Sequence, residues 1–155
     1  MALMPQFFEP SYDAELTQMI TGIVEREGPI LDDVLARRVA RLHGWHRTGT
    51  KITERVTRIA SKACRKTSED VGVFFWPGNL ETGQPVPFRS GLERSVDEIC
   101  MPELVSLALD VLAQGASTED AVAAMAKAVG LQRLRSTSRR RLESAIRRGQ
   151  RRLRG

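Results

Sequence analysis

The chain has 155 residues, of which 41% are hydrophobic and 5% aromatic, and its formal net charge is +5 at pH 7. This length allows one domain, or two small lobes, with a mainly aliphatic core. No apolar run is long enough to span a membrane, and the amino-terminal residues lack the basic and apolar regions of a secretory signal. We therefore expect a cytoplasmic protein without membrane contacts.

Positive charge is concentrated in two segments. Residues 37–66 contain ten basic residues and one acid, and residues 131–155 contain ten arginines and one acid. An arginine-rich composition raises the number of arginines but does not by itself cluster them. Two basic segments in a chain whose other regions are moderately acidic therefore indicate a polyanionic partner, with nucleic acid as the first candidate.

Hydrophobic periodicity predicts three helices in the first half of the chain. The first runs from about Asp13 to Arg26 and is ended by residues 27–29, Glu-Gly-Pro. The second runs from about Leu31 to His43, with Gly44 as its left-handed cap. The third runs from about Thr50 to Lys66.

The turn between the second and third helices has a recognisable pattern. A small side chain at Ala40 lets two helices cross closely, Gly44 supplies a positive φ, and Trp45 is expected to pack back into the core. His43 and His46 flank this turn. Two histidines without a third nearby ligand predict capping or surface roles, and no metal site.

The third predicted helix has two separate faces. Its apolar positions recur at helical spacing and are Ile52, Val56, Ile59, Ala60 and Ala63. A continuous basic stripe follows another face and consists of Lys51, Arg55, Arg58, Lys62 and Arg65. Solvated helix faces usually mix acids with bases, whereas Glu54 is the one acid of this helix. We therefore predict that the stripe lies in a major groove of DNA, together with Arg47, Thr53 and Thr57.

The segment after the third helix predicts a β-hairpin. Residues 71–77 are β-branched and aromatic and should form a strand, and residues 85–89 could return beside it at a sheet edge. Three helices followed by a hairpin is the order of a winged helix. We therefore expect a mainly α protein with a winged-helix lobe at residues 12–90 (three helices plus a β-hairpin wing), a linker at residues 91–101, and a second, helix–turn–helix-like three-helix lobe at residues 102–155 with a basic C-terminal arm.

The second lobe looks like a degenerate repeat of the first. At an offset of 86 or 87 residues, Gly115, Ala126, Gly130, Leu131, Arg133 and Leu142 take the places of Gly28, Ala40, Gly44, Trp45, Arg47 and Val56. Helices are predicted from Pro102, from Ser117 to about Val129, and from Ser136 or Thr137, with Leu153 inward and the final residues fraying into the arm. The nucleic-acid contacts expected here are Arg133, Arg135, Arg139, Arg140 and Arg147.

Several motifs of the first half also carry a family resemblance. They are an opening Glu-Gly-Pro-Ile, a basic helix, a Gly–apolar–x–Arg–x–Gly turn and an apolar strand ending near Trp-Pro, which here correspond to Glu27, Gly28, Pro29, Ile30, Arg38, Gly44, Arg47, Gly49, Ile52 and Trp76. Phe88, Arg89 and residues 99–109 are also similar. The chain thus resembles an uncharacterised domain at the C-terminal end of large bacterial superfamily 1 helicase-like proteins. The resemblance implies a helicase-associated, winged-helix-like DNA module.

No catalytic motif is found in the sequence. It contains no Gly-Lys pair, hence no phosphate-binding loop for ATP, and no G-x-S-x-G elbow. Cys64 and Cys100 lie apart from any histidine and are expected to be buried free thiols. We therefore expect no enzymatic activity, no cofactor and no metal.

The predicted function is DNA binding without catalysis, to duplex or forked DNA, in association with a helicase or nuclease. It would use the basic helix at residues 50–66 and the Arg-rich C-terminal helix. The alternative is a winged-helix protein–protein docking module of a DNA-processing complex, with an interaction surface made of Phe7, Phe8, Trp76 and Phe88. RNA ranks third, because no aromatic stacking platform is recognisable.

Overall fold

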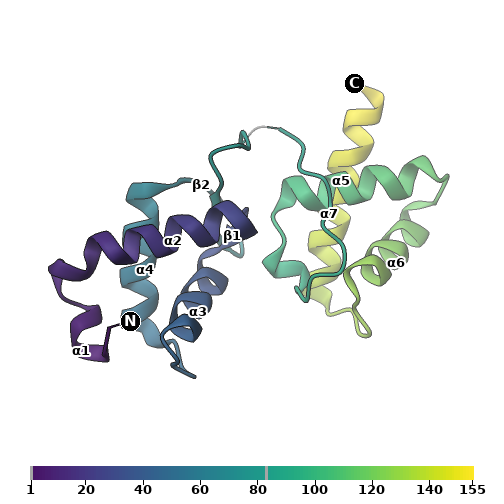
Figure 1. Cartoon of the computed structure of the whole chain (residues 1–155). Helices are drawn as coiled ribbons and strands as arrows, with labels where there is room; N and C mark the ends of the chain where they lie inside the picture. The colour runs from purple at the N-terminus through teal and green to yellow at the C-terminus, as the bar shows by residue number, and fades with distance from the viewer. Residues whose placement is uncertain (1, 83) are drawn as a thin grey trace. The chain divides into compact units, whose positions relative to one another are not determined.

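Helices account for most of the residues that the computed structural model describes, 2–82 and 84–155. The chain divides into two units, Met1–Thr82 and Gly83–Gly155 (Figure 1). Each unit has its own hydrophobic core. The expectation of a mainly α protein is confirmed. Within the described residues, no helix combines the length and the apolar character needed to cross a membrane.

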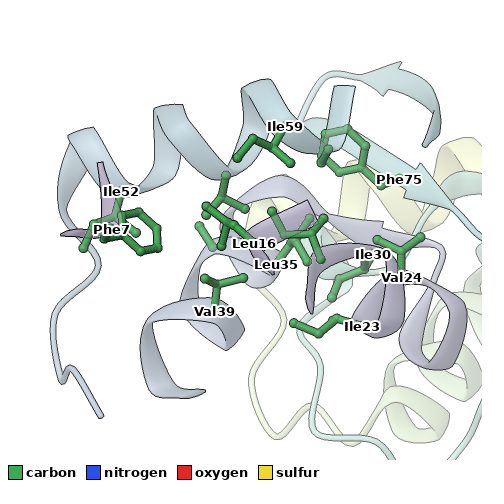
Figure 2. Packing of buried hydrophobic residues seen from close by; sticks show 14 of the residues in the cluster. Phe7, Leu16, Ile23, Val24, Ile30, Leu35, Val39, Ile52, Ile59 and Phe75 are labelled. Carbon is green, nitrogen blue, oxygen red and sulfur yellow. The ribbon is translucent and has the colours of Figure 1, made fainter. Parts of the chain in front are cut away.

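The first unit packs three long helices around an aliphatic core. A short helix and a 3-10 turn come first, so that the order is α1 (Met4–Phe7), η1 (Pro10–Tyr12), α2 (Asp13–Glu27), α3 (Asp32–Leu42) and α4 (Gly49–Ala63). Leu16 of α2, Val39 of α3 and Val56 of α4 are completely buried. Figure 2 shows side chains of these three helices pointing toward one another, with Phe7 of α1 against Ile52 at one end of the core.

A small antiparallel sheet closes the other end of this core. Its strands are β1 (Ile30–Leu31), β2 (Arg65–Glu69) and β3 (Gly72–Trp76), in the order β1-β3-β2. Phe75 of β3 lies opposite Ile30 on one side and Lys66 on the other. The predicted strand at residues 71–77 is therefore confirmed, and its side chains Phe74, Phe75 and Trp76 are buried.

Two predictions about this hairpin are wrong. Residues 85–89 form no strand, because Pro85 and Pro87 have no backbone N–H to donate to a ladder. The partner strand is β2, whose first residues were assigned to the third helix. That helix ends at Ala63, because the next positions that would face the core are occupied by polar Lys66, Thr67 and Asp70.

The second unit is built from three helices. A 3-10 turn precedes them, so that the order is η2 (Val96–Glu98), α5 (Met101–Ala113), α6 (Thr118–Val129) and α7 (Ser136–Arg154). Residues 91–101, expected to form a linker, lie in this unit and include η2 and the buried Ile99. The last residues are helical to Arg154 and do not fray, and Leu153 is 64% exposed where an inward position was predicted.

The predicted turns at Gly44 and Gly130 have the same geometry. Both glycines have a positive φ, 80° and 90°. The N–H of the next residue donates to the carbonyl five positions earlier in each case, Trp45 to Ala40 and Leu131 to Ala126, both at 2.9 Å. This is the Schellman pattern of helix ends. The predicted positive φ is thus confirmed at both turns, whereas the matched glycines Gly28 and Gly115 differ, with φ of −73° and +85°.

The turn geometry gives a prediction for stability. Gly44→Val or Gly130→Val should lower the free energy of unfolding by more than about 1 kcal/mol, because a β-branched residue is strained at a positive φ. A Cβ at either glycine would meet no atom within 4 Å, so the loss comes from the backbone rather than from a clash. Urea unfolding of each variant measures it.

Gly149 of α7 is the matched control, because it is buried inside a helix. A Cβ there would lie 3.6 Å from Ala108, an ordinary contact distance. Gly149→Ala should therefore leave stability unchanged or raise it by up to about 1 kcal/mol. Equal losses for Gly149→Ala and Gly130→Val would contradict this assignment of the turns.

Candidate nucleic-acid interface

Helix α4 keeps a basic surface, but a smaller one than its sequence predicts. Lys51, Arg58 and Lys62 are exposed and share one face at spacings of seven and four residues. Arg47 is exposed in the turn before the helix. Helix α4 therefore offers three exposed cations, and the turn before it offers a fourth.

Two threonines expected among these cations are half-buried beside the basic face. The hydroxyl of Thr53 donates to the carbonyl oxygen of Gly49 at 2.9 Å. This hydroxyl is therefore used within the helix rather than offered to a ligand, and Thr57 is only partly accessible.

Arg55 corrects the prediction of a continuous stripe. Its side chain is buried, and its Nε donates to the carbonyl oxygen of Phe7 at 2.6 Å. One Nη donates to the carbonyl oxygen of Glu9 at 3.0 Å and to a carboxylate oxygen of Asp13 at 2.6 Å. Arg55 therefore ties α4 to the segment that leads into α2 and is not available to DNA.

Arg65 also leaves the stripe. It lies in β2 rather than in the helix, and its Nη donates to the carbonyl oxygen of Pro77 at 2.8 Å. The same guanidinium contacts the carbonyl oxygens of Gly78 and Leu80. Arg65 thus fastens the chain that follows β3.

The outer side of α4 is hollowed and carries mixed charge. An open hollow of about 730 Å³ is lined by Asp33, Gly49, Thr50, Thr53, Glu54, Thr57 and Arg58. Its two carboxylates disfavour a phosphate next to the hydroxyl groups. Arg58 also lines this hollow, and Glu54 lies three residues after Lys51 and four before Arg58, so that one acid interrupts the basic surface formed by Lys51, Arg58 and Lys62.

Helix α7, like α4, has one buried arginine and several exposed ones. Arg141 is 4% exposed and donates to the carbonyl oxygens of Ile99 at 2.7 Å and Val96 at 3.3 Å. It lies 86 residues after Arg55, the same offset that relates Leu142 to Val56. Both arginines therefore reach the segment just before the first long helix of their unit.

Most of the other predicted contacts of the second unit lie on its surface. Arg133, Arg135, Arg140 and Arg147 are exposed, and Arg139 is half-buried with an Nη 3.6 Å from a carboxylate oxygen of Glu119. The sequence-based set omitted four exposed arginines of α7, which are Arg148, Arg151, Arg152 and Arg154. The signal that could have found two of them is helical spacing, since Arg151 and Arg154 share a face with Arg140 and Arg147.

The aromatic residues around the first turn form part of the core. Trp45 is half-buried and packs on Phe7, with ring centroids 5.2 Å apart. This confirms that Trp45 packs back into the core. The Nδ1 of His43 lies 2.7 Å from the carbonyl oxygen of Val39, and its Nε2 lies 2.6 Å from the hydroxyl of Tyr12. His43 is therefore fixed between helix α3 and η1.

The aromatic set expected for the alternative, protein-docking function is largely internal. Phe7 and Trp76 are 0% and 1% exposed, and Phe88 packs against the second core. Phe8 alone of the four is exposed. That predicted docking surface is therefore wrong.

A buried ion cluster in the second unit has no counterpart in the sequence analysis. Glu103 of α5 is completely buried, and its carboxylate accepts hydrogen bonds from Arg89 at 2.9 Å and Arg94 at 2.5 Å. Burial raises the pKa of Glu103, but the hydrogen bonds from both arginines outweigh this, so that the pKa lies below its ordinary value. The cluster holds residues 84–95, which lack regular structure, against α5.

Both cysteines are free thiols, Cys100 buried and Cys64 half-buried. Burial raises the pKa of the Cys64 thiol, and the charge of Glu25 raises it further. A thiol with a raised pKa is a weak nucleophile at neutral pH. This environment fits a structural role for Cys64.

Comparison with known proteins adds one finding. A family described as a protein of unknown function (DUF3320) matches residues 5–54, which run from within α1 through α2 and α3 and the first turn to the first residues of α4. No curated protein and no solved structure matches the chain. The similarity to an uncharacterised family is therefore established for this part of the first unit.

The opposite environments of Arg55 and Arg58 give a prediction within one helix. Arg55→Ala should lower the free energy of unfolding by about 2–4 kcal/mol, because two backbone carbonyl groups and Asp13 lose their charged partner. Arg58→Ala should change it by less than about 0.5 kcal/mol, since Arg58 is exposed. Denaturant unfolding of both variants tests this. Equal losses of stability in the two variants would contradict the assignment of Arg55 as structural and Arg58 as a surface residue.

The Glu103 cluster predicts acid sensitivity. Because the pKa of Glu103 is lower in the folded than in the unfolded state, its contribution is complete well above the ordinary value of 4.5 and is lost as the pH falls through the folded value. Glu103→Gln should cost about 3–5 kcal/mol at pH 7, by leaving two arginine charges uncompensated. Unfolding measured between pH 3 and pH 7 should show a weaker pH dependence in this variant.

Glu93→Gln is the control for this measurement, because Glu93 is an exposed acid of the same segment. It should retain both the stability and the pH dependence of the unmodified protein. A Glu103→Gln protein as stable at pH 7 as the Glu93→Gln protein would show that the cluster contributes nothing.

Proposed function

We propose that the protein is a non-catalytic DNA-binding module that acts with a helicase or nuclease. The observation that carries this proposal is the common arrangement of α4 and α7. Each helix follows a turn at a glycine with positive φ and keeps one arginine buried inside its unit. Each also exposes more cations than acids. Exposed cations on the second helix of a helix–turn–helix are suited to DNA phosphates.

The first unit is proposed to be a winged helix. Three helices precede the hairpin β2–β3, and β1 between α2 and α3 joins the sheet, which supports this assignment. In such a unit α4 would lie at the major groove. Lys51, Arg58 and Lys62 would contact phosphates on one side of the groove, with Arg47 beside them.

Protein docking remains the second candidate function. The observation that favours it is a group of exposed apolar side chains at the start of the chain, Leu3, Met4 and Phe8. Phe8 is the one residue that they share with the aromatic set inferred from the sequence, and they lie apart from the exposed cations of α4 in the chain. The family match over residues 5–54 includes Phe8, and a helicase or nuclease is the partner proposed for this surface.

Titration of labelled duplex, forked and single-stranded DNA at several salt concentrations tests DNA binding. The affinity should fall steeply as salt rises, because each neutralised phosphate of duplex DNA contributes about 0.9 to the slope of log K against log salt. Replacing Arg58 and Lys62 together by Ala should lower that slope by about 1.8. The fold should persist, since both side chains are exposed.

The matched control replaces Arg26 and Lys127 by Ala. These are exposed cations of α2 and α6, outside both basic helices, and their loss changes the net charge equally. This control should keep a slope close to that of the unmodified protein. DNA binding that is absent, or that responds equally to both double substitutions, would refute the proposed role of α4.

A further inference from the structure

Helix α7 continues where its counterpart in the first unit ends. Helix α4 stops at Ala63, which corresponds to Gly149 at the offset of 86 residues. Helix α7 runs on to Arg154, and residues 151–155 are all exposed. In Figure 1 this yellow end of α7 extends past α5. The second unit therefore has a helical projection at the position where the first unit has the hairpin.

The outward side of α7 carries a row of four arginines. Arg140, Arg147, Arg151 and Arg154 are exposed and recur at spacings of seven, four and three residues, which places them on one face. At a rise of 1.5 Å per residue, the row is about 21 Å long. Within the described residues, none of these four guanidinium groups is held by an ion pair.

The charge on the two flanks of this row is unequal. On one flank lie Arg139, which is paired with Glu119, and the acid Glu143. On the other flank lie Arg148 and Arg152, both exposed. A helix that fills a major groove of about 12 Å faces phosphates on both walls. Helix α7 is positively charged toward one side only, and this suits contact with one phosphate backbone.

The row is also poorly suited to reading bases. Base-edge contacts that specify a sequence need polar side chains in fixed orientations, whereas phosphate contacts position a protein without specifying sequence. Among the described residues, no side-chain hydrogen bond or ion pair holds the four arginines in place. Gln150 of the same helix donates to the hydroxyl of Thr118 at 3.2 Å.

We infer that α7 binds a single phosphate backbone of DNA, independently of sequence, through Arg140, Arg147, Arg151 and Arg154. This inference rests on the proposed DNA-binding function and assigns it a substrate class, namely any DNA strand, paired or unpaired. Since one backbone suffices, duplex and single-stranded DNA present the same contact to α7. The projecting turn with Arg151 and Arg154 lengthens the contact beyond the core of the unit.

The test replaces Arg147 and Arg151 by Ala in the full chain and measures DNA affinity against salt. Three duplexes of unrelated sequence and one single strand serve as probes. The slope should fall by about 1.8 on every duplex and by about 1.4 on the single strand, as two lost phosphate contacts predict. The Arg26 and Lys127 double substitution is the control with equal charge and should keep the slope.

Three results would overturn the inference. One is a slope equal to that of the control, and another is a loss confined to duplex DNA, which would indicate a groove rather than one backbone. The third is a loss of affinity that differs more than tenfold between the duplexes, which would indicate base reading. Failure of the unmodified protein to bind any probe refutes the proposed function itself, whereas these three results leave binding through α4 intact.

Discussion

A buried arginine that donates to backbone carbonyl groups fixes the geometry of each unit. Arg55 reaches from α4 to the carbonyl oxygens of Phe7 and Glu9, and Arg141 reaches from α7 to those of Val96 and Ile99. A planar guanidinium with several donors can satisfy two carbonyl groups that would otherwise lose their water on folding. The contact joins the last helix of a unit to the segment before its first long helix. Together with the buried apolar face of that helix, it sets which side of the helix faces solvent. The proposed DNA-binding surfaces depend on that orientation.

The same side-chain type therefore has two roles in this chain, and position decides between them. Arginines that reach backbone carbonyl groups or Glu103 stabilise the fold, while those of the outer side of α7 remain exposed. Counting arginines consequently overestimates the surface available to a polyanion. The first unit illustrates the difference. Of the five cations in its predicted stripe, Arg55 is buried and Arg65 lies in β2, where it donates to the carbonyl oxygen of Pro77.

The helices and turns could be predicted from the sequence, because hydrophobic periodicity and the conformational preference of glycine depend only on residues close together in the chain. The contacts that the sequence did not reveal are made with distant backbone. Arg55 lies at the edge of the apolar face, and its acceptors lie 46 and 48 residues away, so that its burial has no local signal. The start of β2 was missed because its residues are polar and follow a strong helix without a break. The burial of Glu103 was missed for a related reason. Its partners Arg89 and Arg94 lie in residues 84–95, and only the fold brings this segment against α5.

The matched positions of the two units suggest how the chain arose. The turns at Gly44 and Gly130 and the arginines at 55 and 141 share one geometry at nearly one offset, while surface positions differ, with Glu54 and Ser61 in one unit where Arg140 and Arg147 stand in the other. Duplication of an ancestral three-helix unit would explain this pattern. Interior contacts would then have been retained in both copies because each is needed for folding, and outer positions would have been free to diverge. One copy would have kept or acquired strands after its last helix, and the other a longer helix, so that one three-helix arrangement would have come to present two chemically different faces.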